Sequence, residues 1–540
     1  MRTLPCRSAP RCLRHGLSAL ALGLALAGTA PWAMAQGQPA FDVTEASLRE
    51  LQLALTAQRT SSVALVDAYL ARIAAYDEQG PALNALLTLN PDAREQAAAL
   101  DAERRRSGAR GPLHGIPIVL KDNYATAELP TTGASLALAD FTATGNATQV
   151  QRLLDAGAII LGKTNLHEFA YGITTISSLG GQTRNPYDPT RIPGGSSGGT
   201  AAAIAASFAA VGMGSDTCGS IRIPAAFNNL VGLRPTKGLS SIHGIMPLSS
   251  TQDVAGPLAR STEDLAVVLD IVSGYDPADA ATQVMRERAR PAFWNNLQRA
   301  TFAGVRIGRL LHYYDTAEPP VRAALDAALT KMQALGAEIV DVNIPELADL
   351  LARSGLISHE FEADLNAWLA AFDSEGAALT LEAIVASGQY HEAVEGVLTR
   401  SAEAEQDPVR YQAALAARQE LRTAITSAMG SAGVELLAYP PAGALPVTIG
   451  EAQPGNNCSL SANSGLPALS MPVGFSADGL PVGMELLGAE FADVRLVALG
   501  HAWEKATQPR RAPAVTPPLV GRTRATGVSN STIVTPEVRQ

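Results

Sequence analysis

Short apolar runs of strand length alternate with helical patterns along most of the chain. One such run, residues 158–161, follows an apolar helix face at 150–154, and Gly157 separates the two. This alternation is typical of parallel sheets, because only a crossover connection can join parallel neighbours. The sequence therefore predicts an α/β fold with a largely parallel sheet. The expected strands are residues 115–120, 158–161, 210–214, 305–307, 339–344, 466–475 and 481–487.

Helical segments are marked by capping residues as well as by apolar spacing. Ser61 and Ser62 can cap a helix with apolar residues at 65, 66, 69, 73 and 76. Asn90-Pro91 can begin a second helix that stops near Gly108. Further helices are expected at residues 197–209, 321–335 and, for the most part, 356–430.

The helical region 356–430 carries four aromatic side chains. Buried aromatics dominate protein cores, and we therefore interpret these as core residues rather than as walls of a pocket. They are Phe361, Trp368, Phe372 and Tyr390.

The first 35 residues have the three parts of a secretory signal. Arginines at positions 2, 7, 11 and 14 form a basic start, an apolar stretch follows at 17–27, and Ala33-Met34-Ala35 is a small-x-small cleavage site. The apolar stretch is shorter than a stable membrane-spanning helix, so stable membrane insertion is not expected. We therefore expect cleavage after Ala35 and a periplasmic or secreted protein, with a retained N-terminal anchor as the alternative.

Removal of residues 1–35 takes away four arginines and no acidic residue, so the formal charge changes from −10 to −14. An acidic protein lacks the basic surface that nucleic-acid binding requires, and we exclude nucleic-acid partners on this ground. The remaining chain is expected to form one folded domain over residues 36–508. From Pro509 the sequence is rich in proline, arginine and serine without periodicity, so residues 509–540 are predicted to form a flexible tail.

The cysteines do not define a disulfide scaffold. Cys6 and Cys12 leave with the signal, and only Cys218 and Cys458 remain. The sequence leaves open whether these two pair in an oxidising compartment.

Residues 157–164, GAIILGKT, match the phosphate-loop pattern G-x-x-x-x-G-K-[ST]. A phosphate loop follows a strand, stays open so that its N–H groups face the anion, and begins a helix. Here the middle residues form an apolar run, and a helix precedes them. The context therefore argues against a nucleotide site.

The pentapeptide GGSSG at 194–198 matches the G-x-S-x-G nucleophile elbow of α/β-hydrolases. That elbow needs an apolar strand immediately before the serine turn. Residues 185–193 contain three prolines and are predicted to form a loop instead. A serine–histidine triad completed by His243, His359 or His501 is kept as the alternative chemistry.

Two serines lie in separate glycine-rich turns within residues 194–224. Ser196 and Ser220 are 24 residues apart, enough for the helix and strand expected between them to return the chain near its start. Glycines beside each serine permit left-handed backbone and a close approach of N–H groups to an oxygen. The alternative is that glycine and serine simply form turns and caps. Two such turns, with a buried strand that ends in Lys121 upstream, argue against that alternative and make the lysine and the two serines candidates for catalysis.

These turns and the segments around them resemble the amidase signature family. The resemblance extends from about Thr44 to Gln508, which makes 36–508 an amidase domain, and is densest between Gly115 and Thr236. It implies the amidase signature fold, with a mixed, mostly parallel sheet flanked by helices and a helical region on the substrate side. The matching stretches are GIPIVLKDN (115–123), GKTNLHEFAYG (162–172), NPYDPTRIPGGSSGG (185–199), GSDTCGSIRIPAA (214–226), GLRPT (232–236), GLPALSMPVGF (465–475) and DGLPVGMELLG (478–488).

The resemblance implies a role for each catalytic residue. Ser220, the serine of GSIR, would be the nucleophile. Ser196, the first serine of GGSSGG, would follow a cis peptide bond after Gly195. It would pass a proton between Ser220 and Lys121, the lysine that follows GIPIVL. The resemblance implies no metal and no organic cofactor.

Backbone N–H groups would form the oxyanion hole for the reacting carbonyl, and one such donor is typically worth about 10²–10³ in rate. Cys218 departs from the glycine expected at its position in the family. Its side chain would lie beside the reacting carbonyl, which leaves the shape of the pocket open without affecting hydrolysis. The N–H groups would come from Thr217, Cys218, Gly219 and Ser220.

The chemistry of lysine and serine agrees with these roles. A serine hydroxyl is a weak nucleophile until a nearby base takes its proton. Lysine can be that base only where burial or neighbouring groups lower its pKa towards the working pH. Lys121 stands where an apolar strand ends, a position that can bury it, and the alternative is a lysine exposed at the strand end.

Three neighbours are assigned supporting roles. Ser197 is expected to hydrogen-bond within the Ser196 turn, and Asp216 to order its own loop. Arg222 is expected to form an ion pair or to bind backbone groups rather than the substrate.

The leading interpretation is an amidase that attacks an amide carbonyl, releases an amine or ammonia, and hydrolyses the acyl-enzyme with water. Its partners would be a small amide substrate and water, and homodimer formation is left open. The glutaminase-like subunit of a tRNA-dependent amidotransferase is an alternative within the family. That role requires cytoplasmic partner subunits, so the signal segment argues against it. A non-catalytic binding protein on the same scaffold is a further alternative, but the lysine and both serines are present.

Overall fold

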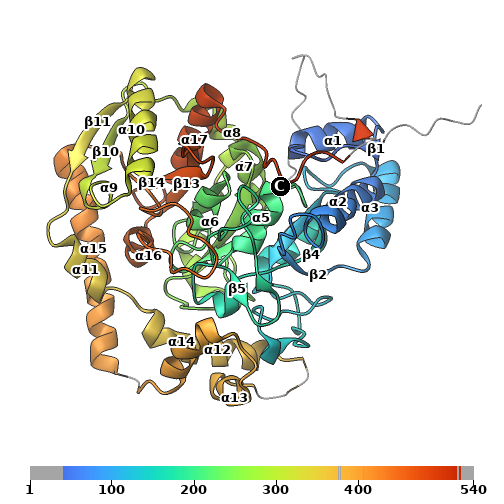
Figure 1. Cartoon of the computed structure of the whole chain (residues 1–540), viewed down its shortest axis with the longest axis horizontal. Helices are drawn as coiled ribbons and strands as arrows, with labels where there is room; N and C mark the ends of the chain where they lie inside the picture. The colour runs from blue at the N-terminus through green and yellow to red at the C-terminus, as the bar shows by residue number, and fades with distance from the viewer. Residues whose placement is uncertain (1–39, 375, 377–378, 406, 520–521, 524–540) are drawn as a thin grey trace, which may run out of the picture. The chain divides into compact units, whose positions relative to one another are not determined.

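The centre of the fold is a mixed sheet of eleven strands (Figure 1). The computed structural model describes residues 40–374, 376, 379–405, 407–519 and 522–523. In spatial order the strands are β11 (Glu338–Val342), β10 (Arg306–Leu310), β12 (Leu436–Tyr439), β14 (Pro481–Gly488), β13 (Ala468–Phe475), β8 (Val231–Arg234), β9 (Val254–Ala259), β7 (Gly212–Asp216), β3 (Pro117–Lys121), β4 (Ile159–Thr164) and β2 (Leu86–Leu89).

Parallel pairs form two groups in this sheet. β10 pairs in parallel with β11 and β12, and β3 pairs in parallel with β4 and β7. Antiparallel pairs join the two groups and add β2 at one edge. The α/β class is confirmed, and the alternation of strands and helices predicted the parallel groups. It did not predict the antiparallel centre, where residues 476–480 join β13 to β14 and are too few for a crossover.

β3 and β7 carry the candidate residues into the interior of the protein. All five residues of β3, Pro-Ile-Val-Leu-Lys, are buried, as expected for a strand with a neighbour on each side and helices over the sheet. β7 begins two residues later than predicted and is also buried throughout. A Cβ on Gly214 of β7 would lie 2.9 Å from Ser197 Oγ, so glycine is needed here for the close approach of the Ser196 turn.

Helices flank the sheet. The helix predicted to begin at Asn90-Pro91 begins at Ala93 instead, with Asp92 as its N-cap, because Asn90 Oδ1 accepts the N–H of Asp92 at 2.9 Å in a turn before the helix. Ser61 accepts the N–H of Ala64 at the start of α2, and Gly108 caps the end of α3. The helices are α1 (Leu48–Thr56), α2 (Ser62–Tyr76), α3 (Ala93–Ser107), α4 (Thr148–Asp155), α5 (Gly198–Ala205), α6 (Arg222–Phe227), α7 (Thr262–Val272), α8 (Phe293–Asn296), α9 (Leu311–Tyr314), α10 (Pro319–Ala334), α11 (Leu347–Arg353), α12 (Ile357–Phe372), α13 (Leu381–Ser387), α14 (Glu392–Ala402), α15 (Pro408–Ala432), α16 (Ser459–Ser464) and α17 (Asp493–Thr507). Short 3₁₀ turns lie at Leu136–Leu138, Glu168–Ala170, Ala280–Met285 and Leu297–Arg299, and short strands at β1 (Ala40–Phe41), β5 (Ile176–Ser177), β6 (Gly181–Gln182) and β15 (Arg522–Thr523).

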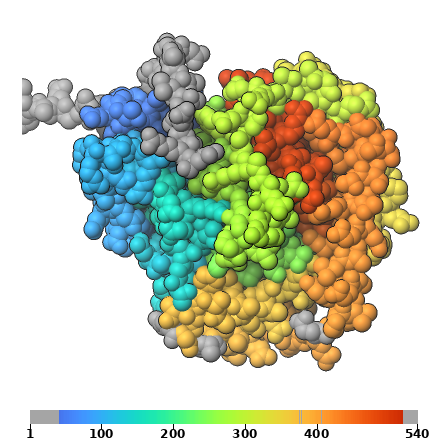
Figure 2. All heavy atoms as spheres, turned by 180° about the vertical axis from the view of Figure 1, so that it is seen from behind, coloured from blue at the N-terminus to red at the C-terminus, as the bar shows by residue number. Residues whose placement is uncertain are grey.

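The predicted helical region 356–430 is confirmed as α12 to α15. Helices α12, α13 and α14 lie together at the lower end of Figure 1, and the view from behind shows the same end covered by them (Figure 2). Backbone hydrogen bonds tie them to an earlier loop, from Ala137 N–H to Gln389 O and from Thr144 N–H to Phe372 O, both at 3.0 Å. Phe361 and Trp368 are buried in the main core, which confirms their interpretation as core residues, and Phe372 and Tyr390 pack against that core.

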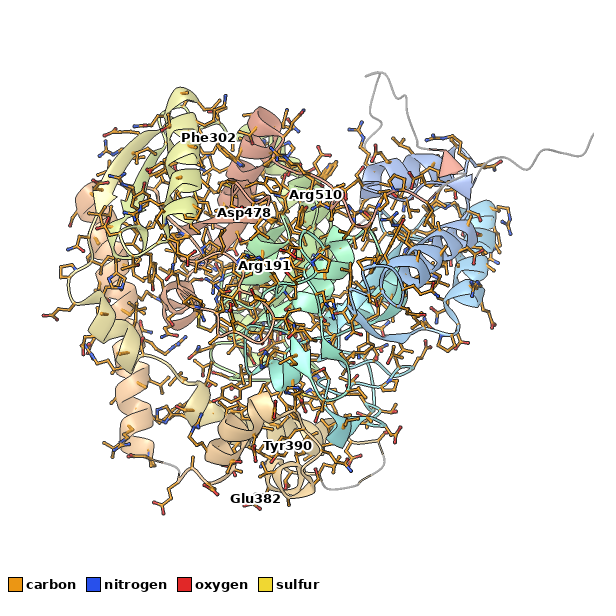
Figure 3. The ribbon with its side chains drawn as sticks, in the orientation of Figure 1. Arg191, Phe302, Glu382, Tyr390, Asp478 and Arg510 are labelled. Carbon is orange, nitrogen blue, oxygen red and sulfur yellow. A yellow bond between two sulfur atoms is a disulfide. The ribbon has the colours of Figure 1, made fainter. Side chains whose placement is uncertain are left out.

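The prediction of a flexible tail from Pro509 does not hold for residues 509–519. Arg510, labelled in Figure 3, forms an ion pair with Glu45 at 2.7 Å and donates to the carbonyl of Ala205 at 2.9 Å. Arg72 donates to the carbonyls of Thr516 at 2.8 Å and Pro517 at 3.0 Å. These contacts need no apolar periodicity, and the sequence criterion therefore missed them. The rest of the predicted tail, apart from β15, lies outside the described residues.

The described residues begin with β1, which pairs in parallel with β15. The predicted signal at 1–35 and its cleavage site after Ala35 lie outside them. Within the described ranges, no helix has both the length and the apolar character needed to cross a membrane.

Candidate active site

Lys121 ends β3 with its side chain fully buried. Its Nζ donates to Ser196 Oγ at 2.7 Å and to Ser215 Oγ at 2.8 Å. Ser215 lies near the end of the neighbouring strand β7 and also accepts a hydrogen bond from Asn123 Nδ2 at 3.0 Å. The amine is therefore held in one position by two hydroxyl groups.

Burial lowers the pKa of Lys121 from 10.5 to about 7. The carboxylates of Asp253 and Asp216 oppose this effect, but they do not reverse it. Near neutral pH the lysine therefore populates both its neutral form and its charged form. The alternative of an exposed lysine at the strand end is excluded.

Ser196 lies in the turn that leads into α5, and the Gly195–Ser196 peptide bond is cis, as the resemblance implied. The hydroxyl of Thr175 packs inside this turn, donating to the carbonyl of Gly194 at 2.7 Å and accepting the N–H of Gly198 at 3.1 Å. A Cβ on Gly198 would lie 2.2 Å from Thr175 Oγ1. Glycine is therefore required there for the turn to close on Thr175.

Backbone contacts bring the second serine turn against the first. The N–H of Ser197 donates to the carbonyl of Ser220 at 3.2 Å, and Ser197 Oγ donates to the carbonyl of Ser215 at 3.2 Å. Ser197 therefore joins the two turns, a wider role than the support within its own turn that the sequence suggested. Ser220 is buried, and its hydroxyl makes no hydrogen bond to any other described residue. Its oxygen is thus not engaged by another group.

Asp216 orders the loop of Ser220, as predicted. Its two carboxylate oxygens accept the N–H of Gly219 at 2.8 Å and the N–H of Ile221 at 3.1 Å. The geometry does not support the expectation that Gly219 N–H belongs to the oxyanion hole, because that donor is directed to Asp216. Thr217, Cys218 and Ser220 are then the remaining candidates for the oxyanion donors.

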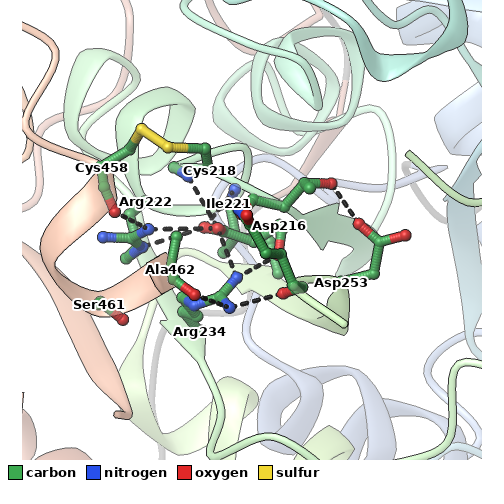
Figure 4. Close-up of polar contacts among 12 residues, drawn as sticks. Asp216, Cys218, Ile221, Arg222, Arg234, Asp253, Cys458, Ser461 and Ala462 are labelled. Atoms are coloured by element: carbon green, nitrogen blue, oxygen red, sulfur yellow. Dashed lines mark hydrogen bonds and ion pairs between the residues drawn. A yellow bond between two sulfur atoms is a disulfide. The ribbon is translucent and has the colours of Figure 1, made fainter. Parts of the chain in front are cut away.

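A network of buried ion pairs holds this loop in place (Figure 4). Arg222 bonds to Asp216 at 3.0 Å and to Glu485 at 2.6 Å, and Arg234 bonds to Asp216 at 2.9 Å. Burial alone would raise the pKa of Asp216, but the two guanidinium groups outweigh it and lower that pKa. The prediction that Arg222 forms an ion pair is confirmed.

A disulfide bond joins Cys218 to Cys458, the residue just before α16 (Figure 4). Their Cα atoms are 4.9 Å apart although 240 residues separate them in the sequence. The question that the sequence left open is therefore answered by the fold. The bond ties the loop of the candidate nucleophile to a distant helix.

The two excluded motifs have the contexts expected of them. Residues 159–164 form strand β4, and the ammonium of Lys163 pairs with buried Asp122 at 2.8 Å rather than lining an open loop. The segment before Ser196 is a loop, so the nucleophile elbow is absent.

No histidine ring in the described part of the chain hydrogen-bonds to Ser196 or Ser220. His167 contacts the Ser196 turn through its backbone N–H, which donates to the carbonyl of Ser196 at 3.1 Å. Of the histidines considered for a triad, His501 bonds to Thr262, while the rings of His243 and His359 lie in tilted contact with aromatic rings. The serine–histidine alternative therefore has no support in the geometry.

The sequence missed the groups that surround the lysine and the oxyanion loop. Ser215 and Asn123 were not predicted, because single polar residues at strand ends form no pattern. Asp253 was also missed, although its carboxylate accepts hydrogen bonds from the hydroxyl of Thr217 and the N–H of Leu248. The available signals were their places in the stretches 115–123 and 214–226 that resemble the family, and their proximity in sequence to Lys121 and Asp216.

Comparison with known proteins agrees with the fold and the site. The Amidase family model matches residues 64–497. The chain therefore belongs to the amidase signature family, and it is an enzyme that hydrolyses carbon–nitrogen bonds of amides other than peptide bonds.

Three relatives illustrate the range of the family. A glutamyl-tRNA(Gln) amidotransferase subunit of Chloroflexus aurantiacus is 37% identical over 482 residues, 85% of this chain and 96% of that protein. The native peptide amidase of Stenotrophomonas maltophilia is 38% identical, with a TM-score of 0.79 over 87% of this chain and 99% of that chain. The corresponding amidotransferase subunit of Thermotoga maritima is 27% identical with a TM-score of 0.71, covering 89% of this chain and 100% of that chain.

Proposed function

We propose that this amidase forms an acyl-enzyme on Ser220, with Ser196 as proton relay and Lys121 as base. The observation that carries the proposal is the 2.7 Å contact between Lys121 Nζ and Ser196 Oγ in a fully buried site. An ordinary lysine is almost wholly protonated at neutral pH, whereas a pKa of about 7 leaves much of Lys121 able to accept a proton.

In the first half-reaction Ser220 Oγ attacks the amide carbonyl while its proton passes through Ser196 to Lys121. The N–H groups of Thr217, Cys218 and Ser220 are the donors offered to the developing oxyanion. The protonated lysine then returns the proton through Ser196 to the leaving nitrogen, and the carbon–nitrogen bond breaks. In the second half-reaction the same relay takes a proton from water, which attacks the ester carbonyl of the acyl-enzyme. The bond to Ser220 Oγ breaks, the relay returns the proton to Ser220, and the carboxylic acid is released.

Peptide amides are the substrate class that we propose. The similarity to a peptide amidase at 38% identity and nearly full coverage supports this class. The second candidate is the glutaminase-like role within an amidotransferase, which the 37% identity to the Chloroflexus aurantiacus protein favours. The purified protein alone should release ammonia from a peptide amide much faster than from glutamine. The opposite preference would select the second candidate.

Labelling of the nucleophile tests the mechanism itself. A fluorophosphonate should attach to Ser220 and abolish amide hydrolysis, and peptide mapping by mass spectrometry identifies the labelled residue. The control is Ser459→Ala, which changes another serine close to the Cys218 loop. The probe should attach to Ser220 of this variant as it does in the wild type. Attachment to Ser196 with Ser220 unlabelled would reverse the proposed roles.

We also propose that the protein is exported and begins at Gln36. The signal pattern of residues 1–35 supports this, and a disulfide such as Cys218–Cys458 is typical of oxidising compartments. The intact mass of the protein recovered from the periplasm or medium should correspond to residues 36–540. A chain that begins at Met1 in the membrane fraction would contradict the proposal.

A further inference from the structure

The Cys218–Cys458 disulfide lies where a change in its redox state would reach the reaction. Cys218 is two residues before Ser220 and is itself an expected oxyanion donor, while Cys458 precedes α16. We propose that this disulfide is a thiol-exchange site, and that its opening by a dithiol reductant lowers the amidase activity. The inference rests on the proposed role of Ser220.

The two sulfur atoms differ in access. Cys458 is 3% exposed and lies in an apolar cluster with Ile223 and Phe227, whereas Cys218 is only partly buried at the edge of that cluster. An incoming thiolate therefore attacks Cys218 Sγ. The sulfur–sulfur bond breaks, and Cys458 leaves as a thiolate that takes up a proton.

The second thiol of the reductant completes the reduction. The second thiol of the reductant loses its proton and attacks the mixed disulfide at the reductant's own sulfur. Cys218 leaves as a thiolate and is protonated in turn. The reductant becomes a cyclic disulfide, so two electrons have passed from the dithiol to the cysteine pair.

The disulfide is the covalent cross-link on the side chain of residue 218. Asp216 holds the N–H groups of Gly219 and Ile221, and Asp253 holds the hydroxyl of Thr217. The side chain of Cys218 has the disulfide, a 3.6 Å contact between its sulfur and Ser459 Oγ, and packing at the edge of the apolar cluster, while Gln252 Nε2 donates to the Thr217 carbonyl of its peptide group at 3.3 Å. Opening the bond removes the covalent cross-link on the Cys218 side chain, so residue 218 can shift against these anchors and change the direction of its N–H.

The expected consequence is a loss of rate rather than of binding or fold. An oxyanion donor acts in the transition state more than in the ground state, so its displacement lowers kcat and leaves KM nearly unchanged. The Arg222 contacts with Asp216 and Glu485 do not involve sulfur and continue to hold the loop on the sheet.

The test is native reduction of the purified protein with dithiothreitol, followed by alkylation with iodoacetamide and mass spectrometry of the peptides that contain Cys218 and Cys458. Both cysteines should become alkylated while the circular dichroism spectrum stays native. The kcat for a peptide amide should fall at least about tenfold, with KM changed less than about twofold. Reoxidation with oxidised glutathione, in place of alkylation, should restore kcat.

The double variant Cys218→Ser/Cys458→Ser should be slow from the start and insensitive to dithiothreitol. Full alkylation with unchanged kcat would overturn the proposal, and so would a disulfide that opens only after the protein unfolds. Failure of the proposed function has a different signature, because Ser220→Ala would then keep its amide hydrolysis in the oxidised enzyme.

Discussion

Lys121 Nζ lies 2.7 Å from Ser196 Oγ, although 75 residues separate them in the sequence. The end of β3 brings the lysine there, and the cis turn before α5 brings the serine. In the described part of the protein no carboxylate forms an ion pair with this lysine, and its low pKa follows from burial. The proposed base and the proposed relay are therefore assembled by the fold before any substrate binds.

The pH dependence of stability should report this buried amine. Below pH 7 Lys121 is protonated in both the folded and unfolded states, and burying its charge destabilises the fold. Between pH 7 and 10.5 the unfolded state binds more protons than the folded state, so the free energy of unfolding rises with pH relative to Lys121→Met. Guanidinium-induced unfolding at pH 6 to 10 gives the free energy of unfolding of the wild type and of the variant. A difference that does not vary with pH would show that the lysine titrates normally.

Ser215→Ala should slow catalysis and move its pH dependence. The variant removes an acceptor that stabilises the ammonium form, so the pKa of Lys121 should fall further and the acidic limb of kcat/KM should shift to lower pH. The loss of a hydrogen bond to a charged group should cost about tenfold in kcat/KM at the plateau. Ser215→Thr keeps the hydroxyl and should restore both values. An unchanged limb in Ser215→Ala would contradict the assigned contact.

Asp216→Asn should destabilise the protein by about 3–5 kcal/mol at pH 7, because Arg222 and Arg234 lose their shared carboxylate. The folded pKa of Asp216 is lowered, so its contribution is present above the unfolded value of 3.8 and is lost as pH falls through the folded value. The difference in the free energy of unfolding between the wild type and Asp216→Asn should therefore become smaller below about pH 4.

A matched change at the surface provides the control for Asp216→Asn. Asp67 forms an exposed pair with Arg94, and Asp67→Asn should change the free energy of unfolding by only about 0–1 kcal/mol. Equal effects of the two substitutions would contradict the structural role of the buried network.

The candidate catalytic set could be predicted because each of its members sits in a stretch that resembles the amidase signature family. An apolar run ends at Lys121, and glycines surround Ser196 and Ser220. Ser215 has no such pattern, since one serine in a strand resembles many others. Its importance depends on the parallel pairing of β3 with β7, which brings it beside the lysine.

Contacts between distant segments were the part of the fold that the sequence left open. The pairing of Cys218 with Cys458 depends on where α16 packs, and no spacing of two cysteines could indicate it. Arg510 fixes a proline-rich segment through hydrogen bonds to backbone carbonyls, which leave no periodic trace. The N–H of Gly219 was assigned to the oxyanion hole because side-chain competition from Asp216 is visible only in three dimensions.

The most direct test of the lysine as base is kcat/KM for a peptide amide in Lys121→Arg, with the exposed substitution Lys331→Arg as control. Guanidinium stays protonated throughout the accessible pH range and cannot accept the proton of Ser196. The proposed mechanism predicts a loss of at least about 10²-fold at every pH, comparable in Ser196→Ala, while Lys331→Arg keeps full activity. A folded Lys121→Arg enzyme that retains most of its amide turnover would contradict it.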